Sequence, residues 1–167
     1  MPYSKTIYWD SCIWIAWLWN ELRDNHEMDG IFECAGYINR SEYLLIVSSI
    51  FNTEVAQTGL SEDAQRALET FLTRRNVQMM EIDVRVGALS IDIKKYYRDL
   101  HKKDGKGELT DNDATHLATA IHYRVDAFYT FDDGGKGDRS LLSLNGDVAG
   151  NPLVVCKPPV TQLRLFT

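Results

Sequence analysis

Short apolar segments, rich in β-branched and aromatic residues, alternate along this chain with longer segments of helical character. The strand-like segments are 5–9 (KTIYW), 43–47 (YLLIV), 77–83 (VQMMEID), 127–131 (AFYTF) and 151–159 (NPLVVCKPP). Short runs of this composition, bounded by turn residues, are typical of buried strands. Strands that alternate with helices predict an α/β fold, in which helices cover both faces of a parallel sheet.

The segments between these strands carry the apolar spacing and the capping residues of helices. Helices are predicted over 11–23, 50–57, 61–75 and 84–103 and over a segment that begins near Asp113, with a weaker pattern over 31–41. The polar stretch 20–30 is expected to contain a turn around Met28–Gly30. Because the 167 residues contain no repeat, linker or low-complexity tract, we expect a single domain over 1–167.

Composition and charge exclude several classes of protein. The longest apolar run, 12–19, is too short to span a bilayer and no leader-like segment precedes it, so we expect a cytoplasmic protein without a membrane partner. The three cysteines form no CxxC pair, which argues against a zinc site and a disulfide framework. The net charge of −6 argues against a protein that coats nucleic acid, but it allows a nuclease with one local basic patch.

Four acidic residues from distant segments are expected at one edge of the predicted sheet. Asp10 ends the first strand, Asp132 follows the fourth, and Asp113 lies in the first turn of a helix, beside its buried stripe. Glu54 is predicted about two turns into the helix after the second strand. Ligands bind beyond the carboxyl ends of parallel strands, so the four carboxylates are expected to converge on one cleft. Such a cluster repels itself unless a hard cation such as Mg²⁺ or Mn²⁺ binds, because these ions prefer oxygen ligands.

Each of these acids also has a purely structural explanation. Asp10 could cap the first helix, Asp113 could interact with a helix dipole, and Asp132 could form a turn. Glu54 could be a solvated helix residue. The occurrence of all four at the expected places is what favours a metal site.

Four motifs resemble those of the PIN-domain nucleases, in particular the VapC-like toxins of toxin–antitoxin pairs. The motifs are WDS (9–11), VSSIFNTEV (47–55), DATHLATA (113–120) and YTFDD (129–133). On this resemblance the family's acids correspond to Asp10, Glu54, Asp113 and Asp132, accompanied by Ser48 and Thr130. The resemblance implies a PIN-like three-layer α/β/α fold with a central parallel sheet of four to five strands. This chain departs from the family in a long interval between Asp10 and Ser48 and in a tryptophan-rich first helix.

The resemblance also implies an activity, which is metal-dependent cleavage of RNA phosphodiester bonds that leaves a 5′-phosphate. Asp10, Asp113 and Asp132 would hold the principal Mg²⁺ or Mn²⁺ ion, and Glu54 would hold a second ion or orient the attacking water. Ser11, Ser48 and Thr130 would steady neighbouring carboxylates or waters. Two alternatives stay open, namely a stand-alone PIN nuclease without an antitoxin and a non-catalytic PIN-like module that binds RNA or protein. The complete acid set argues against the second, because binding alone does not require mutually repelling carboxylates.

A basic stretch precedes the Asp113 helix. It consists of Lys94, Lys95, Arg98, Lys102, Lys103 and Lys106, with Tyr96 and Tyr97 between them. Taken singly, these residues are typical of a solvated helix face. In an acidic chain they are nevertheless the best candidates for holding RNA phosphates near the metal.

Three polar residues near the acids are expected to have structural roles. Asp111 is predicted to be the N-cap of the helix that contains Asp113, and Asp133 is predicted to be a turn residue. His116, one turn after Asp113, could donate a hydrogen bond to a carboxylate. Because such a histidine more often only packs in the core, we do not count it among the catalytic candidates.

RNA is the expected substrate, and a small antitoxin protein is the partner that the resemblance implies. The tryptophans Trp14, Trp17 and Trp19 are expected to lie mainly in the core. Any of them that is exposed would offer a surface to an antitoxin or to a second copy of the chain in a homodimer.

Overall fold

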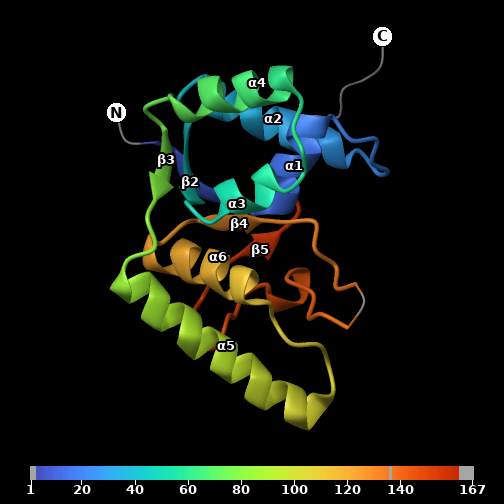
Figure 1. Ribbon diagram of the computed structural model, residues 1–167, viewed down its shortest axis with the longest axis vertical. Coiled ribbons are helices and arrows are strands. Elements are labelled where there is room, and N and C mark those ends of the chain that lie inside the picture. Colours follow the sequence, from blue (N-terminus) through green and yellow to red (C-terminus); the bar gives the residue numbers. More distant parts are fainter. Residues whose placement is uncertain (1–2, 136, 162–167) are drawn as a thin grey trace.

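The computed structural model describes residues 3–135 and 137–161 (Figure 1). These residues contain a five-stranded sheet with the order β3-β2-β1-β4-β5, in which every neighbouring pair is parallel. The strands are β1 (Lys5–Trp9), β2 (Tyr43–Ser48), β3 (Val77–Met80), β4 (Ala127–Tyr129) and β5 (Val155–Cys156). The first strand of the chain is therefore the central strand of the sheet, between β2 and β4. The predicted parallel sheet of four to five strands is confirmed.

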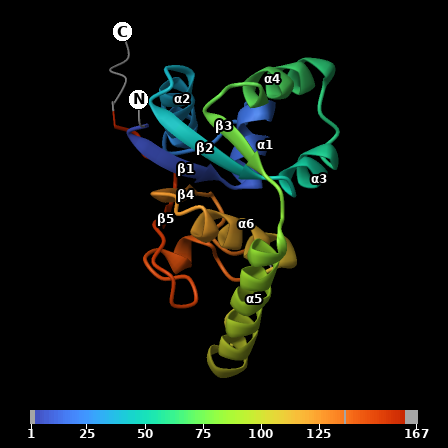
Figure 2. The same cartoon turned by 90° about the vertical axis from the view of Figure 1, so that its left-hand side faces the viewer.

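Helices cover both faces of the sheet, as the alternation of segments predicts. They are α1 (Ser11–Trp19), α2 (Glu27–Asn39), α3 (Phe51–Ala56), α4 (Glu62–Leu72), α5 (Val84–Asp104) and α6 (Asp111–His122), with a 3-10 turn, η1, at Leu142–Leu144. Figures 1 and 2 show α1 to α4 on one side of the strands and α5 and α6 on the other. The result is a three-layer α/β/α arrangement.

Alternate residues of each strand enter two separate hydrophobic cores. In β1, Ile7 and Trp9 pack against α1 to α4, whereas Tyr8 packs against α5 and α6. This alternation follows from the pleat, which directs successive side chains to opposite faces. Of the tryptophans expected in the core, Trp14 is fully buried and Trp17 packs against the same cluster, but Trp19 is 48% exposed.

Three local predictions are wrong in their placement. The predicted turn at Met28–Gly30 lies inside α2, which begins at Glu27, and helix α1 ends at Trp19 because Asn20 adopts a left-handed conformation with φ 46°. Glu54 lies in the first turn of α3 rather than two turns in, because the residues before Phe51 form a turn.

In the described part of the chain, no helix combines the length and the apolar character that crossing a bilayer would require.

Candidate active site at the carboxyl edge of the sheet

Asp10 is fixed by the central strand and by the start of α1. Its backbone N–H donates to the carbonyl of Tyr129 at 3.0 Å, which extends the pairing of β1 and β4 by one residue. One carboxylate oxygen accepts from the N–H of Ser11 at 2.8 Å, and the other accepts from the Thr130 hydroxyl at 2.8 Å. The side chain thus caps α1, and the residue is 4% exposed. The carboxylate is held beside two neighbouring strand ends.

Asp132 lies two residues beyond the buried Thr130, at the start of the loop that leaves β4. Its N–H donates to the Thr130 hydroxyl at 3.0 Å. Its two carboxylate oxygens accept from the N–H groups of Gly134 (2.9 Å) and Leu141 (3.4 Å), and its carbonyl accepts from the N–H of Leu142 at 3.1 Å. The loop therefore closes on the side chain and the backbone of Asp132.

The same loop is tied to the C-terminal end of α5. The guanidinium of Arg139, which is 6% exposed, contacts both carboxylate oxygens of Asp104 at 3.1 Å and donates to the carbonyl of Gly107 at 2.9 Å. A Cβ atom at Gly107 would lie only 2.1 Å from the carbonyl oxygen of Gly137, so this close approach requires glycine. The loop that contains Asp132 is thereby attached to the helix that carries the basic stretch.

Asp113 is held at the N-terminus of α6 by a capping box. The hydroxyl of Thr110 accepts from the N–H of Asp113 at 3.1 Å, and it donates to the Asp113 carboxylate at 2.6 Å. The predicted N-cap, Asp111, is therefore wrong, because Thr110 has the extended backbone and the hydroxyl contact of an N-cap. Asp111 is instead the first helical residue, and it is exposed and paired with Lys94 at 2.9 Å.

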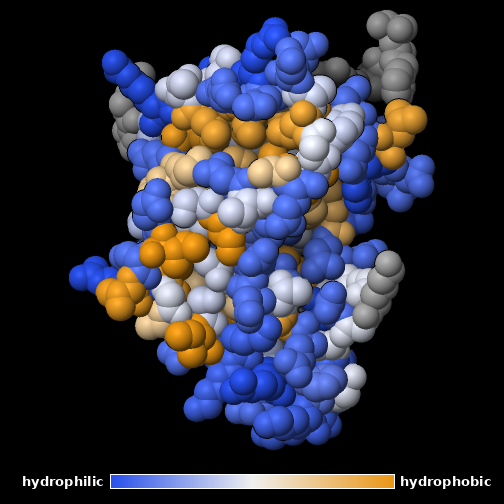
Figure 3. All heavy atoms as spheres, viewed as in Figure 1, coloured by the Kyte–Doolittle hydropathy of each residue, from blue (hydrophilic) through white to orange (hydrophobic). Residues whose placement is uncertain are grey.

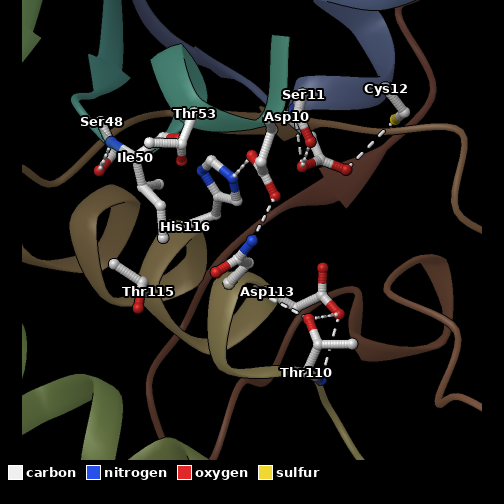
Figure 4. Close-up of polar contacts among 12 residues, drawn as sticks. Asp10, Ser11, Cys12, Ser48, Ile50, Thr53, Thr110, Asp113, Thr115 and His116 are labelled. Carbon is white, nitrogen blue, oxygen red and sulfur yellow. Dashed lines mark hydrogen bonds and ion pairs between the residues drawn. The ribbon is translucent and has the colours of Figure 1, made fainter. Parts of the chain in front are cut away.

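The charges of Asp10, Asp113 and Asp132 act on one another. Burial, together with the negative charge of Asp10, raises the pKa of both Asp113 and Asp132, and this outweighs the hydrogen bonds that each carboxylate accepts. Within the described residues, none of the three forms an ion pair with a lysine or an arginine. Figure 4 shows Asp10 and Asp113 on the same side of His116. Among the described residues, the three acids thus form a negative edge with no lysine or arginine paired to them.

Glu54 is held through both of its carboxylate oxygens by α6. Nε2 of His116 lies 2.7 Å from one oxygen, and the amide of Asn112 donates to the other at 2.9 Å. Nδ1 of His116 lies 2.6 Å from the Tyr8 hydroxyl, which in turn accepts from the N–H of Ser48 at 3.2 Å. The expectation that His116 only packs is wrong. Its ring is fully buried, but it connects Glu54 to Tyr8.

The pairing of Glu54 and His116 shows in the acidity of both groups. Burial alone would raise the pKa of Glu54, but the hydrogen bond and the charge of His116 hold it below its usual value. Burial alone would lower the pKa of His116, but the hydrogen bond to Glu54 and the charges of Asp10, Glu54 and Asp113 raise it. The charges of three of the four candidate acids, Asp10, Glu54 and Asp113, therefore act on this histidine.

Tyr8, Asn112 and Cys12 were not predicted from the sequence, and His116 was considered as a hydrogen-bond donor to a carboxylate but was not counted among the catalytic candidates. Cys12 lies two residues after Asp10, and its sulfur is 3.2 Å from the Asp10 carboxylate. The position of His116 one turn after Asp113, on the buried face of the same helix, was the available signal. Nothing in the sequence identified Tyr8 as its partner, since the pair is separated by 108 residues.

The basic stretch of the sequence lies on α5 and on the loop that follows it. Lys95, Arg98, Lys102, Lys103 and Lys106 are exposed, and Lys94 is half-buried beside Asp111. Tyr96 is exposed as well, whereas Tyr97 is buried under Arg139 and belongs to the core. In Figure 3 the lower part of the molecule, where α5 ends, is strongly hydrophilic. Lys102 is paired with Asp99 at 3.2 Å, but the exposed side chains of this stretch can still meet an extended polyanion.

The site offers oxygen ligands to a hard cation, although no ligand set is assembled. Among the described residues, no three His, Cys, Asp or Glu side chains stand together as a group that could hold a metal ion. The reason is visible at Asp10 and Glu54, whose oxygens are turned to donors of the protein itself. Carboxylates without basic partners and with raised pKa values are nevertheless suited to Mg²⁺ or Mn²⁺, because a cation would remove their mutual repulsion.

A family model for the PIN domain matches residues 7–135, a span that contains all four candidate acids. No curated protein sequence matches the chain significantly.

Several solved structures share the fold at low sequence identity. The VapBC2 complex of Rickettsia felis, bound to a DNA fragment from its promoter, contains a chain with 15% identity and a TM-score of 0.52, covering 75% of this chain and 86% of that one. A toxin–antitoxin complex from Klebsiella pneumoniae contains a chain with 17% identity and a TM-score of 0.51; the match covers 80% of this chain and 96% of that one. VapC20 of Mycobacterium tuberculosis is described as a toxin that cleaves the sarcin–ricin loop. It has 16% identity and a TM-score of 0.51, and the match covers 87% of this chain and 99% of that one.

Proposed function

Because the chain belongs to the PIN domain family, we propose that it is a metal-dependent endoribonuclease that hydrolyses RNA phosphodiester bonds at the carboxyl edge of its sheet. The observation that carries this proposal is the arrangement of three carboxylates, Asp10, Asp113 and Asp132, which Thr130 and Thr110 hold and with which no lysine or arginine of the described chain forms an ion pair. In a purely structural role, only the hydrogen bonds of these carboxylates and the nearby His116 would offset their mutual repulsion. A bound cation compensates it.

Asp10, Asp113 and Asp132 would hold the principal Mg²⁺ or Mn²⁺ ion, and Glu54 would hold a second ion or orient the attacking water. When bound, such an ion lowers the pKa of water and stabilises the charge that develops on the phosphoryl group. The protein's own residues supply the positions. Thr130 fixes one oxygen of Asp10 and the backbone of Asp132, and Thr110 fixes Asp113.

We further propose that this nuclease is the toxin of a toxin–antitoxin pair. Support comes from the similar structures, since two of them are complexes of a toxin with its antitoxin and the third is a toxin that cleaves an RNA loop. The substrate would be single-stranded RNA or a structured RNA cut at a loop. The partner would be a small antitoxin protein encoded beside this chain.

The nuclease proposal is tested by incubating purified protein with single-stranded and stem-loop RNA in the presence of Mg²⁺, Mn²⁺ or EDTA. We expect cleavage with either ion, none with EDTA, and products that carry a 5′-phosphate. A non-catalytic binding module would shift the RNA in a gel without shortening it under any of these conditions. That outcome would replace the nuclease proposal with the binding alternative.

The toxin proposal needs a separate experiment in cells. Expression of the chain is expected to arrest growth, and co-expression of the small open reading frame next to its gene is expected to restore growth. A stand-alone nuclease would cleave RNA in vitro, but no adjacent gene product would relieve its effect on growth.

The exposed basic face of α5 gives a prediction about RNA affinity. Replacing Lys94, Lys95 and Lys102 by alanine is expected to weaken RNA binding and to lower the slope of log affinity against log salt by up to roughly 2 for single-stranded RNA, because each phosphate contact contributes about 0.7. Filter binding at several salt concentrations measures both quantities, and Mn²⁺ binding should be preserved.

A matched control removes the same charge from the opposite layer. Arg40, Arg66 and Arg75 lie in or next to α2 and α4, and their replacement by alanine also lowers the net charge by three. If both triple variants lose affinity equally, the effect is one of overall charge, and α5 does not hold the RNA.

A further inference from the structure

We propose that His116, anchored by Tyr8, is a positioning residue that fixes the Glu54 carboxylate at the acidic edge of the sheet. Its consequence for cleavage rests on the proposed nuclease function. The hydrogen-bonded chain itself can be tested without that function.

Glu54 needs such a partner because of where it lies. Helix α3 has only six residues, Phe51–Ala56, and its N-cap residue, Ile50, makes no side-chain capping hydrogen bond. A single short turn does not by itself hold a glutamate in one orientation. Both oxygens of Glu54 instead meet donors from α6, His116 at 2.7 Å and Asn112 at 2.9 Å. Helix α6 therefore sets the direction of the Glu54 carboxylate.

The imidazole of His116 is itself held at its second nitrogen. An ionised carboxylate only accepts hydrogen bonds, so Nε2 carries the proton that faces Glu54. Nδ1 lies 2.6 Å from the Tyr8 hydroxyl, whose oxygen accepts from the N–H of Ser48. The ring of Tyr8 is in turn stacked on Phe128, with centroids 5.1 Å apart and planes 6° from parallel. Neither ring can rotate without losing buried contacts.

This chain of contacts ties Glu54 to the other acids through rigid elements. Tyr8 lies on β1 two residues before Asp10, and His116 lies on α6 three residues after Asp113. The position of the Glu54 carboxylate is thus set by β1 and α6, the strand and the helix that also position Asp10 and Asp113. Partners that orient a carboxylate in this way typically contribute 10- to 100-fold to metal affinity or activity.

A purely structural histidine would satisfy the same hydrogen bonds, so the test must separate the two roles. We would compare His116→Leu, His116→Gln and Tyr8→Phe with the parent, measuring kcat and KM for RNA cleavage and the Kd for Mn²⁺. His116→Leu is expected to lower kcat by about 10- to 100-fold with little change in KM. His116→Gln is expected to recover part of the rate, because its amide nitrogen can still donate to Glu54. Tyr8→Phe keeps both rings and removes only the anchor, so it carries the test if the leucine variant does not fold.

Two controls identify the path of the effect. Thr119→Val removes another buried hydroxyl from α6, one that bonds only to the helix backbone, and should leave kcat unchanged even if stability falls. In a Glu54→Gln background, His116→Gln should have no further effect on kcat, since its target has been altered already. If the factors by which His116→Gln and Glu54→Gln each lower kcat multiply in the double variant, His116 acts independently of Glu54 and the inference is overturned.

The hydrogen bond can also be read in the protein alone by ¹⁵N NMR of the histidine rings. The proton on Nε2 of His116 is expected to be shifted downfield and protected from exchange, and to move upfield in Glu54→Gln, where the accepting group loses its charge. An unchanged resonance would overturn the positioning role. If the parent neither binds Mn²⁺ nor cleaves RNA, the proposed function fails, while the ring proton still decides whether His116 holds Glu54.

Discussion

Substitution of Asp10 by asparagine is expected to lower the rate of RNA cleavage by at least about a hundredfold while the fold persists. The change keeps the shape of the side chain, and the remaining oxygen can still accept from the N–H of Ser11 and cap α1. The new amide can face the Thr130 hydroxyl, which is able to accept where it now donates. The variant loses the negative charge and the acceptor that faces Thr130 and Cys12, so a large effect on rate with an intact fold would be mainly an effect of charge.

The measurement is single-turnover cleavage in the presence of Mn²⁺, with circular dichroism and thermal unfolding to show an intact fold. Asp133→Asn is the matched control, because Asp133 is exposed and adjacent to a candidate acid but has no place in the proposed site. Its rate should equal that of the parent. Should Asp10→Asn also cleave at the parent rate, then Asp10 serves only as a helix cap and the proposed mechanism fails.

Substitution of Asp113 by asparagine is expected to weaken Mn²⁺ binding by at least about tenfold and to stabilise the metal-free protein at neutral pH. The first effect follows from losing one of three proposed ligands. The second follows from the raised pKa, because the fold disfavours the charged form of Asp113 relative to the unfolded chain. Asparagine keeps the acceptor for Thr110 and removes the charge.

The sign of the second effect depends on pH. The cost of the charge is absent well below the usual aspartate pKa of 3.8, where Asp113 is protonated in both states. It grows as pH rises through that value and is complete above the higher pKa of the folded state. In chemical unfolding at pH 7, Asp113→Asn should therefore have a larger free energy of unfolding than the parent, and this difference should vanish in acid. Calorimetric titration should likewise show no Mn²⁺ binding in acid. Equal Mn²⁺ affinity in the parent and the variant at pH 7 would remove Asp113 from the site.

The sequence predicted the architecture well, because the strands and most of the helices of this fold have a local signal. Four of the five residues of KTIYW are β-branched or aromatic, so β1 was recognisable as a buried strand, and it is the central strand of the sheet. The boundaries of α1 and α3 were less visible. They depend on the left-handed backbone of Asn20 and on a turn before Phe51, neither of which has a strong residue signature here.

The candidate site was only partly predictable, for a different reason. Asp10 and Asp132 could be placed because each follows a strand directly, and position along a strand fixes position in space. The contacts between side chains could not be placed. The Thr130 hydroxyl meets Asp10 across 120 residues, and His116 meets Tyr8 across 108, and pairs at such separations leave no trace in spacing or periodicity. The roles of Tyr8 and His116 became apparent only from the packing of α6 against β1.

The position of β1 at the centre of the sheet has a consequence for how the protein is made. This strand is synthesised before its second neighbour, β4 (Ala127–Tyr129), which follows it by more than a hundred residues. Until then Asp10 lacks the Tyr129 carbonyl and the Thr130 hydroxyl that hold it. Parallel pairing across such a separation is slow to form. The proposed nuclease site is therefore expected to form late in folding, after β4 has paired with β1.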